Sequence, residues 1–361
     1  MKRLPLNSPV TPKLFTPLKL RGVEFRNRIG VSPMCQYSAI DGFVNDWHLQ
    51  HLGARAAGGP GLVIVEATAV SADGRITHGC TGLWADAQIE GMAQIAAFVK
   101  SQGCVAGIQI GHAGRKASAQ LPWEGGGPLS VDPWQTVAPS AIAFDDGWHT
   151  PRELTVAEIH GLVQSFAAAA RRALAAGFQV IEIHGAHGYL MNEFLSPLVN
   201  QRTDEYGGTF ENRTRFLREV IATVRNEWPE DQPVFLRISA SDWVEGGWTI
   251  DDSVELAKMV GPLGIDLIDC SSGGAVAYAK MQVGPGYQVP FAEAVRNRGG
   301  IATAAVGMIT EAHQAEAILS SGQADLVLLA REFLRNPYWP VHAARALGVE
   351  PRIPNQYLRA L

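Results

Sequence analysis

Phe178-Gln-Val-Ile-Glu-Ile183 runs directly into His184-Gly-Ala-His-Gly-Tyr189. The first six residues form a mainly apolar run, which is typical of a strand buried in a parallel sheet. The next six place two imidazoles and a phenol at the end of that strand, among glycines that let the backbone turn sharply. A single histidine there would often only satisfy a backbone carbonyl. Three such groups within six residues instead indicate a site, because imidazole N–H groups can hold a carbonyl or nitro oxygen and a phenol can donate a proton.

Short apolar, β-branched runs like this one recur along the chain. The other seven are Ile29–Val31, Leu62–Val65, Val105–Ile110, Val234–Ile238, Leu267–Ile268, Ile301–Val306 and Leu326–Leu329. Helix-like stretches lie between most of them, clearest at 157–176, 212–228, 252–263 and 311–320, with Thr249 and Thr310 as candidate N-caps of the last two. Eight strand–helix repeats predict an α/β fold, a closed (β/α)8 TIM barrel. An open doubly wound sheet is the alternative, but its G-x-G-x-x-G motif is absent.

Two segments interrupt this alternation. Residues 111–150, after the third strand, contain Trp123, Trp134 and Trp148 and are too long for a simple loop, so we expect a lid insertion over the barrel mouth. A glycine-rich segment, 273–288, is the second. We expect one domain over 1–361, with a flexible N-terminal lead at 1–12.

Composition narrows the class of protein. A chain of 361 residues with 47% hydrophobic and 18% charged residues describes a soluble globular protein, and its apolar runs are too short to span a membrane. The N-terminus lacks the apolar core of a signal peptide. A formal charge of −5 gives no basic footprint for nucleic acid. Four scattered cysteines indicate neither a disulfide framework nor a metal site, and a cytoplasmic location is expected.

Residues at strand ends are the first candidates for function, because barrel active sites lie where the strands end. Besides the His184–Tyr189 cluster, these are Ser32, Pro33, Met34, Cys35 and Tyr37 after strand one, Ala67 after strand two, Gln109 in strand three, Arg237 in strand five, Ser271 after strand six, Gly307 after strand seven, and Ala330 and Arg331 after strand eight.

Several of these residues have two interpretations. Arg237, a cation in an apolar strand, either contacts a ligand or pairs with a buried Asp or Glu. Arg331 either binds a phosphate with Gly307, as barrels commonly do after strands seven and eight, or pairs with Glu332. Cys35 could be an inert buried thiol. His48 and His51 lack a carboxylate at ligand spacing and are interpreted as packing or surface residues.

At these strand ends the sequence resembles the old yellow enzyme family of flavin-dependent ene-reductases. It most resembles the thermophilic-like subclass, close to bacterial NADPH dehydrogenases and xenobiotic reductases. The motifs that match in order are Asn27-Arg-Ile29, Ser32-Pro-Met-Cys-Gln-Tyr37, Val65-Glu-Ala-Thr68, Gly107-Ile-Gln-Ile-Gly-His-Ala-Gly-Arg-Lys116, Ile183–Tyr189, Arg202-Thr-Asp-Glu-Tyr-Gly-Gly208, Glu211-Asn-Arg213 and Leu329-Ala-Arg331.

The resemblance implies FMN, bound noncovalently at the barrel mouth, and NADPH as hydride donor. The main chain of Ser32–Cys35 would line the flavin, with Ala67 and Gln109 on its pyrimidine side and Arg237 near N1. Ser271, Gly307, Ala330 and Arg331 would hold its phosphate. A fixed guanidinium at Arg237 would favour the anionic reduced flavin.

The resemblance also implies the chemistry. His184 and His187 would hold the carbonyl or nitro oxygen of an activated alkene, flavin N5 would deliver hydride to the β-carbon, and Tyr189 would protonate the α-carbon. Tyr37 would add a substrate hydrogen bond, and Cys35 would tune the flavin potential. Nitro compounds or nitrate esters are the alternative substrates.

In this subclass an arginine near the C-terminus reaches the active site of the next subunit. Gln356-Tyr-Leu-Arg359, in the tail 351–361, matches that arginine, so Arg359 is expected to act in trans within a homodimer or homotetramer. Two other classes remain open. A metal-dependent barrel hydrolase would ordinarily carry an H-x-H motif at a strand end, which this sequence lacks, and a non-catalytic flavin- or phosphate-binding barrel would not need Tyr189.

Overall fold

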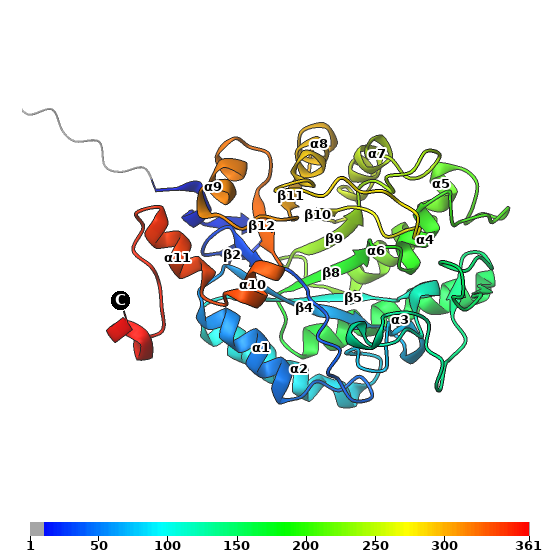
Figure 1. The fold of residues 1–361 in the computed structure, drawn as a ribbon, viewed down its shortest axis with the longest axis horizontal. Coiled ribbons are helices and arrows are strands. Elements are labelled where there is room, and N and C mark those ends of the chain that lie inside the picture. The colour runs from blue at the N-terminus through cyan, green and yellow to red at the C-terminus, as the bar shows by residue number, and fades with distance from the viewer. Residues whose placement is uncertain (1–10, 361) are drawn as a thin grey trace, which may run out of the picture.

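The computed structural model describes residues 11–360, and they form the predicted barrel. Eight parallel strands close on themselves in chain order, so that the last pairs with the first (Figure 1). The strands are β3 (Ile29–Val31), β4 (Leu62–Ala69), β5 (Val105–Gly111), β8 (Val180–Gly185), β9 (Val234–Ser239), β10 (Leu267–Ser271), β11 (Ala302–Ala305) and β12 (Leu326–Leu329). Each contains or overlaps one of the eight apolar runs, which confirms the TIM-barrel prediction.

Helices surround the barrel. The longer ones are α1 (Asp46–Ala57), α2 (Ile89–Ser101), α3 (Val156–Ala175), α6 (Arg215–Glu227), α7 (Ile250–Val260), α8 (Val289–Gly299), α9 (Ala312–Ser320) and α11 (Trp339–Ala346); the short ones are α4 (Leu190–Leu195), α5 (Phe210–Arg213) and α10 (Arg331–Arg335). The helix expected over 212–228 is in fact two, because the chain breaks at Thr214 between α5 and α6.

One of the two expected helix caps is correct. The Thr249 side chain accepts a hydrogen bond from the Asp252 N–H and forms a capping box, which satisfies backbone donors that α7 itself cannot pair. The expectation for Thr310 is wrong. The N-cap of α9 is Glu311, whose side chain makes no capping bond, and the Thr310 N–H instead donates to Gln314 Oε1 at 3.1 Å.

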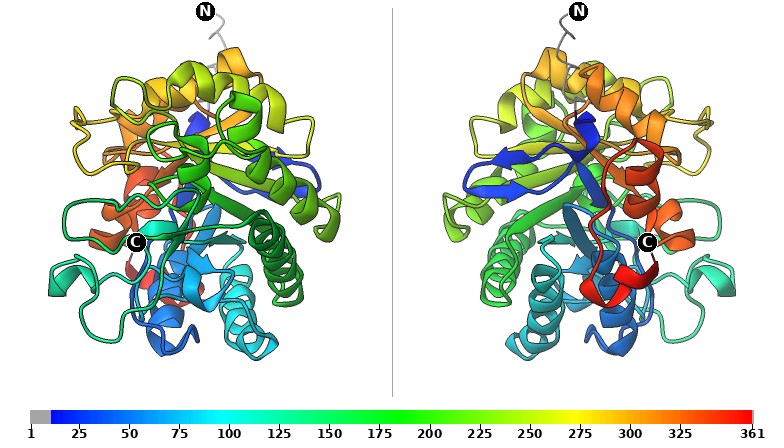
Figure 2. Two further views of the ribbon diagram at one scale, coloured as in Figure 1. Left: turned by 90° about the vertical axis from the view of Figure 1, so that its right-hand side faces the viewer. Right: turned by 90° about the vertical axis from the view of Figure 1, so that its left-hand side faces the viewer.

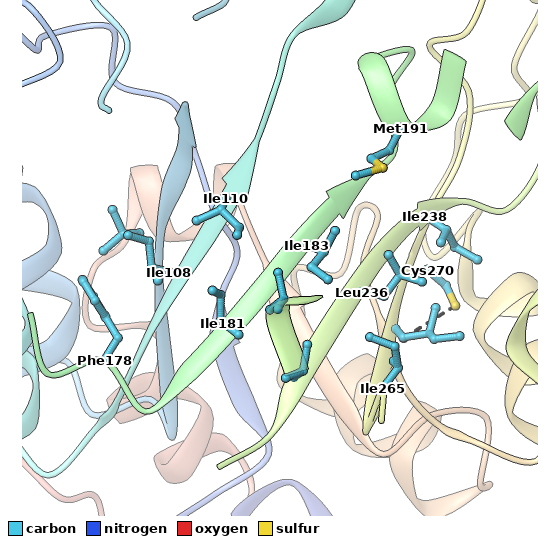
Figure 3. Close-up of a cluster of buried hydrophobic side chains, with 14 of the residues drawn as sticks. Ile108, Ile110, Phe178, Ile181, Ile183, Met191, Leu236, Ile238, Ile265 and Cys270 are labelled. Atoms are coloured by element: carbon cyan, nitrogen blue, oxygen red, sulfur yellow. Dashed lines mark hydrogen bonds between the residues drawn. The ribbon is translucent and has the colours of Figure 1, made fainter. Parts of the chain in front are cut away.

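Residues alternate along each strand between the surrounding helices and the barrel interior. Ile181 and Ile183 of β8 and Leu236 and Ile238 of β9 belong to the cluster that packs strands against helices (Figure 3). Their neighbours Val180 and Phe235 belong to a separate apolar cluster that fills one end of the barrel. Burial on both faces explains why the strands appear in the sequence as nearly continuous apolar runs.

The end where the strands begin is closed by an N-terminal hairpin of β1 (Leu18–Leu20) and β2 (Val23–Phe25) (Figure 2, right). Phe25 stacks on Phe235 with ring centroids 6.2 Å apart. This apolar plug leaves only the opposite end of the barrel, where the strands finish, available for a site. Residues 1–10 of the expected N-terminal lead lie outside the described residues.

The segment 111–150 extends beyond the strand ends on the right of Figure 1. It contains two single-turn helices, η4 (Gly114–Lys116) and η5 (Pro122–Glu124), and the short strand β6 (Val137–Ala138), which pairs with β7 (Arg152–Glu153). The Arg115 guanidinium ties it to the loop after β10 by donating to the carbonyls of Ile142, Ala143 and Ala275. The segment therefore lies at the barrel mouth, where the lid was expected.

The C-terminal tail lies at the other end of the molecule. Its last turn, η6 (Asn355–Ala360), adjoins a hollow lined also by Gly59 and Gln102, which precede β4 and β5 in the chain. It follows that Arg359 cannot reach the mouth of its own barrel. Within the described residues, no helix is long and apolar enough to cross a membrane, and no group of three or more His, Cys, Asp or Glu side chains has the arrangement of a metal site.

Candidate active site

The three rings after β8 converge at the barrel mouth. The ring centroid of His184 lies 5.2 Å from that of His187 and 5.0 Å from that of Tyr189, while His187 and Tyr189 are 6.5 Å apart. The rings meet edge to face, at 82° to 90°. The sequence cluster is therefore a spatial cluster as well.

Both imidazoles are neutral hydrogen-bonding groups here. Burial, followed by the nearby positive charge of Arg237, holds the pKa of His184 and of His187 well below the ordinary value. The Ala186 N–H donates to His184 Nδ1 at 3.2 Å, which leaves the ring proton on Nε2 as a free donor. Nε2 of His187 lies 2.7 Å from Ser271 Oγ. A neutral N–H donor polarises a carbonyl oxygen without transferring a proton to it.

The backbone of His187 is held in an uncommon conformation. Its φ is +64°, in the left-handed region that side chains other than glycine rarely adopt. Its N–H donates to Ser239 Oγ at 2.8 Å, and Lys116 Nζ donates to its carbonyl oxygen at 2.8 Å. Gly274 packs so closely that an added Cβ would lie 2.6 Å from the His187 carbonyl carbon. Strain that is held by several contacts at a barrel mouth points to a functional requirement for this geometry.

A layer of buried polar side chains lies between the apolar plug and the three rings. Arg237 Nε is 3.0 Å from Asp269 Oδ2, across the register that pairs these residues of β9 and β10. Gln109 Nε2 donates to Glu182 Oε1 at 2.8 Å, again between paired residues of neighbouring strands. Of the two interpretations of Arg237, the buried pair is present. It does not use the whole guanidinium, because Nη1 is turned toward Ser32 Oγ, 3.3 Å away.

This layer has two carboxyl groups for one cation. Burial, and then the charge of Asp269, raises the pKa of Glu182 to about 8, and burial raises the pKa of Asp269 to about 6 against the lowering effect of Arg237. Glu182 Oε2 is buried with no hydrogen-bond partner in the described structure. Glu182 therefore holds its proton at neutral pH, while Asp269 serves as the counter-ion of Arg237.

A cavity of about 240 Å³ extends from Arg237 toward the ends of β11 and β12. It is lined by Ser271, Tyr287, Gln288, Gly307, Ala330 and Arg331, among others. Gly307 has a φ of +118°, and an added Cβ would lie 2.8 Å from Gln288 Nε2, so only glycine fits there. The alternative pairing of Arg331 with Glu332 is not found, because Glu332 pairs with Arg335. The residues expected to hold a phosphate thus line one hollow.

The segment after β3 completes the mouth. Tyr37 has a φ of +52°, and its ring meets Trp123 of the segment 111–150 edge to face, with centroids 6.1 Å apart. Glu66 Oε2 accepts a hydrogen bond from the Gln36 N–H at 3.0 Å. Burial, and then the carboxyl of Glu66, raises the pKa of the Cys35 thiol well above its usual range. A thiol held in the neutral form is a poor nucleophile.

The phenol of Tyr189 is likewise kept protonated. Burial, and then Cys35 and Tyr37, raises its pKa well above the ordinary value. The hydroxyl therefore carries a proton at any physiological pH, as a proton donor requires.

Some contacts at the site were not foreseen. His48 does have a carboxylate near it, since its Nε2 lies 3.5 Å from Glu66 Oε1, although the two are far apart in the sequence. Glu182 and Asp269 interrupt apolar runs just as Arg237 does, and this signal could have identified them as its buried neighbours. No pattern of spacing could have placed Lys116 against His187.

Comparison with known proteins identifies the family. The family model described as NADH:flavin oxidoreductase / NADH oxidase matches residues 13–350. The chain belongs to this family, which includes the old yellow enzymes. An NADPH dehydrogenase from Geobacillus sp. (strain WCH70) is 53% identical to the chain over 348 residues, which cover 96% of the chain and 98% of the relative.

Solved structures of old yellow enzymes and related reductases share the fold. The old yellow enzyme homologue from Zymomonas mobilis is 28% identical, with a TM-score of 0.79, and the match covers 95% of this chain and 94% of that one. Morphinone reductase is 29% identical, with a TM-score of 0.78, over 95% and 92% of the two chains. As a member of this family the chain is a flavin-dependent oxidoreductase.

The residues present fit a flavin mononucleotide. The glycine cradle at Gly307 and the exposed guanidinium of Arg331 suit a phosphate, and Arg237, with one nitrogen directed away from Asp269, suits an electron-rich ring edge. Gln109 offers an amide in the same buried layer, beside Glu182.

Proposed function

We propose that this chain is an FMN-dependent NADPH oxidoreductase that reduces the activated C=C bond of α,β-unsaturated carbonyl or nitro compounds. The proposal rests on one observation above all: two neutral imidazoles and a protonated phenol converge at the mouth of the barrel, and His187 contacts Ser271, which lines the phosphate-type cavity. The relatives named NADPH dehydrogenase support the choice of hydride donor.

When bound, FMN would take a hydride from NADPH and supply it to the β-carbon of the alkene. It would be held by the main chain of Ser32–Cys35, by Ala67 and Gln109 beside its pyrimidine ring, and by Arg237. Ser271, Gly307, Ala330 and Arg331 would bind its phosphate. Arg237 would stabilise the negative charge of the reduced ring, and Asp269 keeps that guanidinium in place.

The remaining steps belong to the protein's side chains. The Nε2–H of His184 would donate to the carbonyl or nitro oxygen, and so would the Nδ1–H of His187 in the tautomer whose Nε2 accepts from Ser271 Oγ. These bonds withdraw electrons from the β-carbon and stabilise the enolate-like charge. Tyr189 would then break its O–H bond and give the proton to the α-carbon, while the electron pair stays on the phenolate until solvent reprotonates it. The sum is one hydride and one proton added across the double bond. Tyr37 would add a hydrogen bond to the substrate.

Arg359 would complete the site from a second subunit. It lies at the opposite end of the barrel from His184 in its own chain, so only a partner subunit could bring it to the mouth. We accordingly propose a homodimer or homotetramer.

The test begins with the purified protein. We expect a yellow preparation with bound FMN that NADPH bleaches without oxygen and that 2-cyclohexenone restores. A protein that binds no added FMN would contradict the proposal. Faster reoxidation by nitrate esters than by any enone would instead favour nitro compounds and nitrate esters as the main substrates.

A further inference from the structure

Lys116 occupies a position at the mouth that the proposed chemistry has not used. It ends the single turn η4 after β5. Its Nζ donates to the carbonyl oxygens of His187 at 2.8 Å and of Gly274 at 3.3 Å, and so links the loops after β5, β8 and β10. The same nitrogen lies over two aromatic rings, 4.5 Å from the centroid of Phe144 and 5.2 Å from that of Tyr189.

The positive charge of Lys116 has no paired carboxylate. Within residues 11–360, no Asp or Glu oxygen lies within 4.0 Å of Lys116 Nζ, the limit for a salt bridge. Two carbonyl oxygens and two ring faces surround the ammonium group instead. Glu193 is the nearby acid, but it is fully buried and accepts a hydrogen bond from the Arg115 N–H at 2.8 Å. The field of Lys116 is therefore available to groups in the mouth. It helps to lower the pKa of His184 and of His187, and its Nζ lies over the ring of Tyr189.

The other cations near the mouth are held by different contacts. Arg115 belongs to the same turn, but its guanidinium is directed at the carbonyls of Ile142, Ala143 and Ala275 and joins the lid to the β10 loop. Arg237 also favours the ionised form of Tyr189, but it is paired with Asp269 in the buried layer between the plug and the rings. Of these three cations, Lys116 is the one that contacts the backbone of His187 and the ring of Tyr189 together.

We propose that Lys116 is a positioning residue for proton donation: its ammonium group fixes the left-handed backbone of His187 and stabilises the negative charge left on Tyr189 when the phenol O–H breaks. The inference rests on the proposed function. No further reactant is needed, because Lys116 keeps its own protons and acts only through hydrogen bonds and charge.

The charge of Lys116 also sets a pH range for this role. Burial, against the opposing effect of Glu193, lowers the pKa of Lys116 to about 8. Arg115 lowers it further, and His184 and His187 face the same space as neutral rings. The ammonium form is present at neutral pH and is lost as the pH rises through about 8, so its support of proton donation should be lost over the same range.

The first experiment measures the phenol directly. Trifluorotyrosine, whose phenol ionises at an accessible pH, replaces Tyr189 in the full-length FMN-loaded protein, and 19F NMR follows its ionisation. We expect Lys116→Met to raise that pKa by about 1–2 units, since one unit is a tenfold change in equilibrium. Lys116→Arg should restore most of the shift. Lys100→Met is the matched control, because Lys100 also donates to a backbone carbonyl, that of Gly177 at 2.8 Å, away from the site.

The second experiment uses anaerobic stopped-flow kinetics across pH. We expect Lys116→Met to slow reoxidation by 2-cyclohexenone about 10- to 100-fold while reduction by NADPH stays near the wild-type rate. In the wild type, reoxidation should fall above pH about 8, and in Lys116→Arg this fall should move to higher pH. The comparison of wild type with the arginine variant holds even if the methionine variant folds poorly.

The outcomes separate the two proposals. An unchanged 19F titration in Lys116→Met, or the same pH profile in wild type and Lys116→Arg, would overturn the role of Lys116. If wild-type protein reduces no enone, or if Tyr189→Phe reduces it normally, the proposed function itself is wrong.

Discussion

Arg237 and Asp269 face each other across β9 and β10, with Nε of the arginine 3.0 Å from Oδ2 of the aspartate, inside a closed barrel. An arginine in a mainly apolar strand is costly unless it is paired, and here the pair leaves Nη1 directed toward Ser32 at the mouth. The aspartate thus keeps a fixed positive charge in the barrel and leaves one side of it for a ligand. The proposed binding of FMN depends on this pair of residues.

Removing the positive charge of Arg237 should destabilise the folded protein. In Arg237→Met, Asp269 remains buried beside a second carboxyl group, Glu182, with no counter-ion in the layer. We expect a loss of about 3–5 kcal/mol in the free energy of unfolding, the usual cost of an uncompensated buried charge. Urea denaturation of the FMN-free protein measures it. The double variant Arg237→Met/Asp269→Asn should regain most of the loss; equal stability of the single and double variants would refute the pairing.

A side chain at Gly307 should weaken FMN binding. A side chain is strained at its φ of +118°, and an added Cβ would lie 2.8 Å from Gln288 Nε2 and 3.0 Å from the Tyr287 ring. We expect Gly307→Ala to raise the Kd for FMN about tenfold or more, which is about 1.4 kcal/mol, by fluorescence titration. Gly300→Ala is the control, because Gly300 has a φ of +72° with nothing within 4 Å of an added Cβ. That variant should lose some stability and keep its FMN affinity. If both variants bind FMN equally well, the phosphate does not lie at Gly307.

The protonated Glu182 should make stability depend on pH. Its pKa is raised from 4.5 unfolded to about 8 folded, so the folded state holds a proton that the unfolded state releases in this range. The contribution of Glu182 to stability is therefore present below pH about 4.5 and is lost as the pH rises to about 8. Glu182→Gln, which cannot ionise, should flatten the pH dependence of the unfolding free energy between these values. Glu245→Gln, at an exposed position, should not, and an unchanged slope in Glu182→Gln would show that the buried carboxyl is already ionised.

The tail arginine can be tested by mixing subunits. Arg359→Ala should raise KM for the enone about 10- to 100-fold, the range expected for a lost charged hydrogen bond, with little effect on reduction by NADPH. When Arg359→Ala subunits are unfolded and refolded together with Tyr189→Phe subunits, each mixed dimer should contain one site with both residues intact. Steady-state activity should then exceed the sum of the two parents. No gain, or a monomeric protein by light scattering, would exclude action in trans.

Much of this architecture follows from local sequence pattern. Short β-branched runs predicted all eight strands because burial on both faces requires continuous apolar sequence, and the ring cluster needed only a strand end and the residues after it. The acidic partner of Arg237 could not be predicted from the sequence, because the register between β9 and β10 decides which residue lies opposite it. The break at Thr214, the failure of Thr310 to cap α9, and the contact between His48 and Glu66 depend on packing between distant segments. The contact between Lys116 and His187 depends on such packing as well.

The proposed reaction requires Tyr189 to donate the proton to the alkene beside His184 and His187. The most direct measurement is anaerobic stopped-flow absorbance on FMN-loaded Tyr189→Phe, first with NADPH and then with 2-cyclohexenone. We predict reduction by NADPH near the wild-type rate and reoxidation by the enone slowed about 10²- to 10⁴-fold, the usual contribution of a general acid. Equal slowing of both steps, or reoxidation at the wild-type rate, would contradict the account.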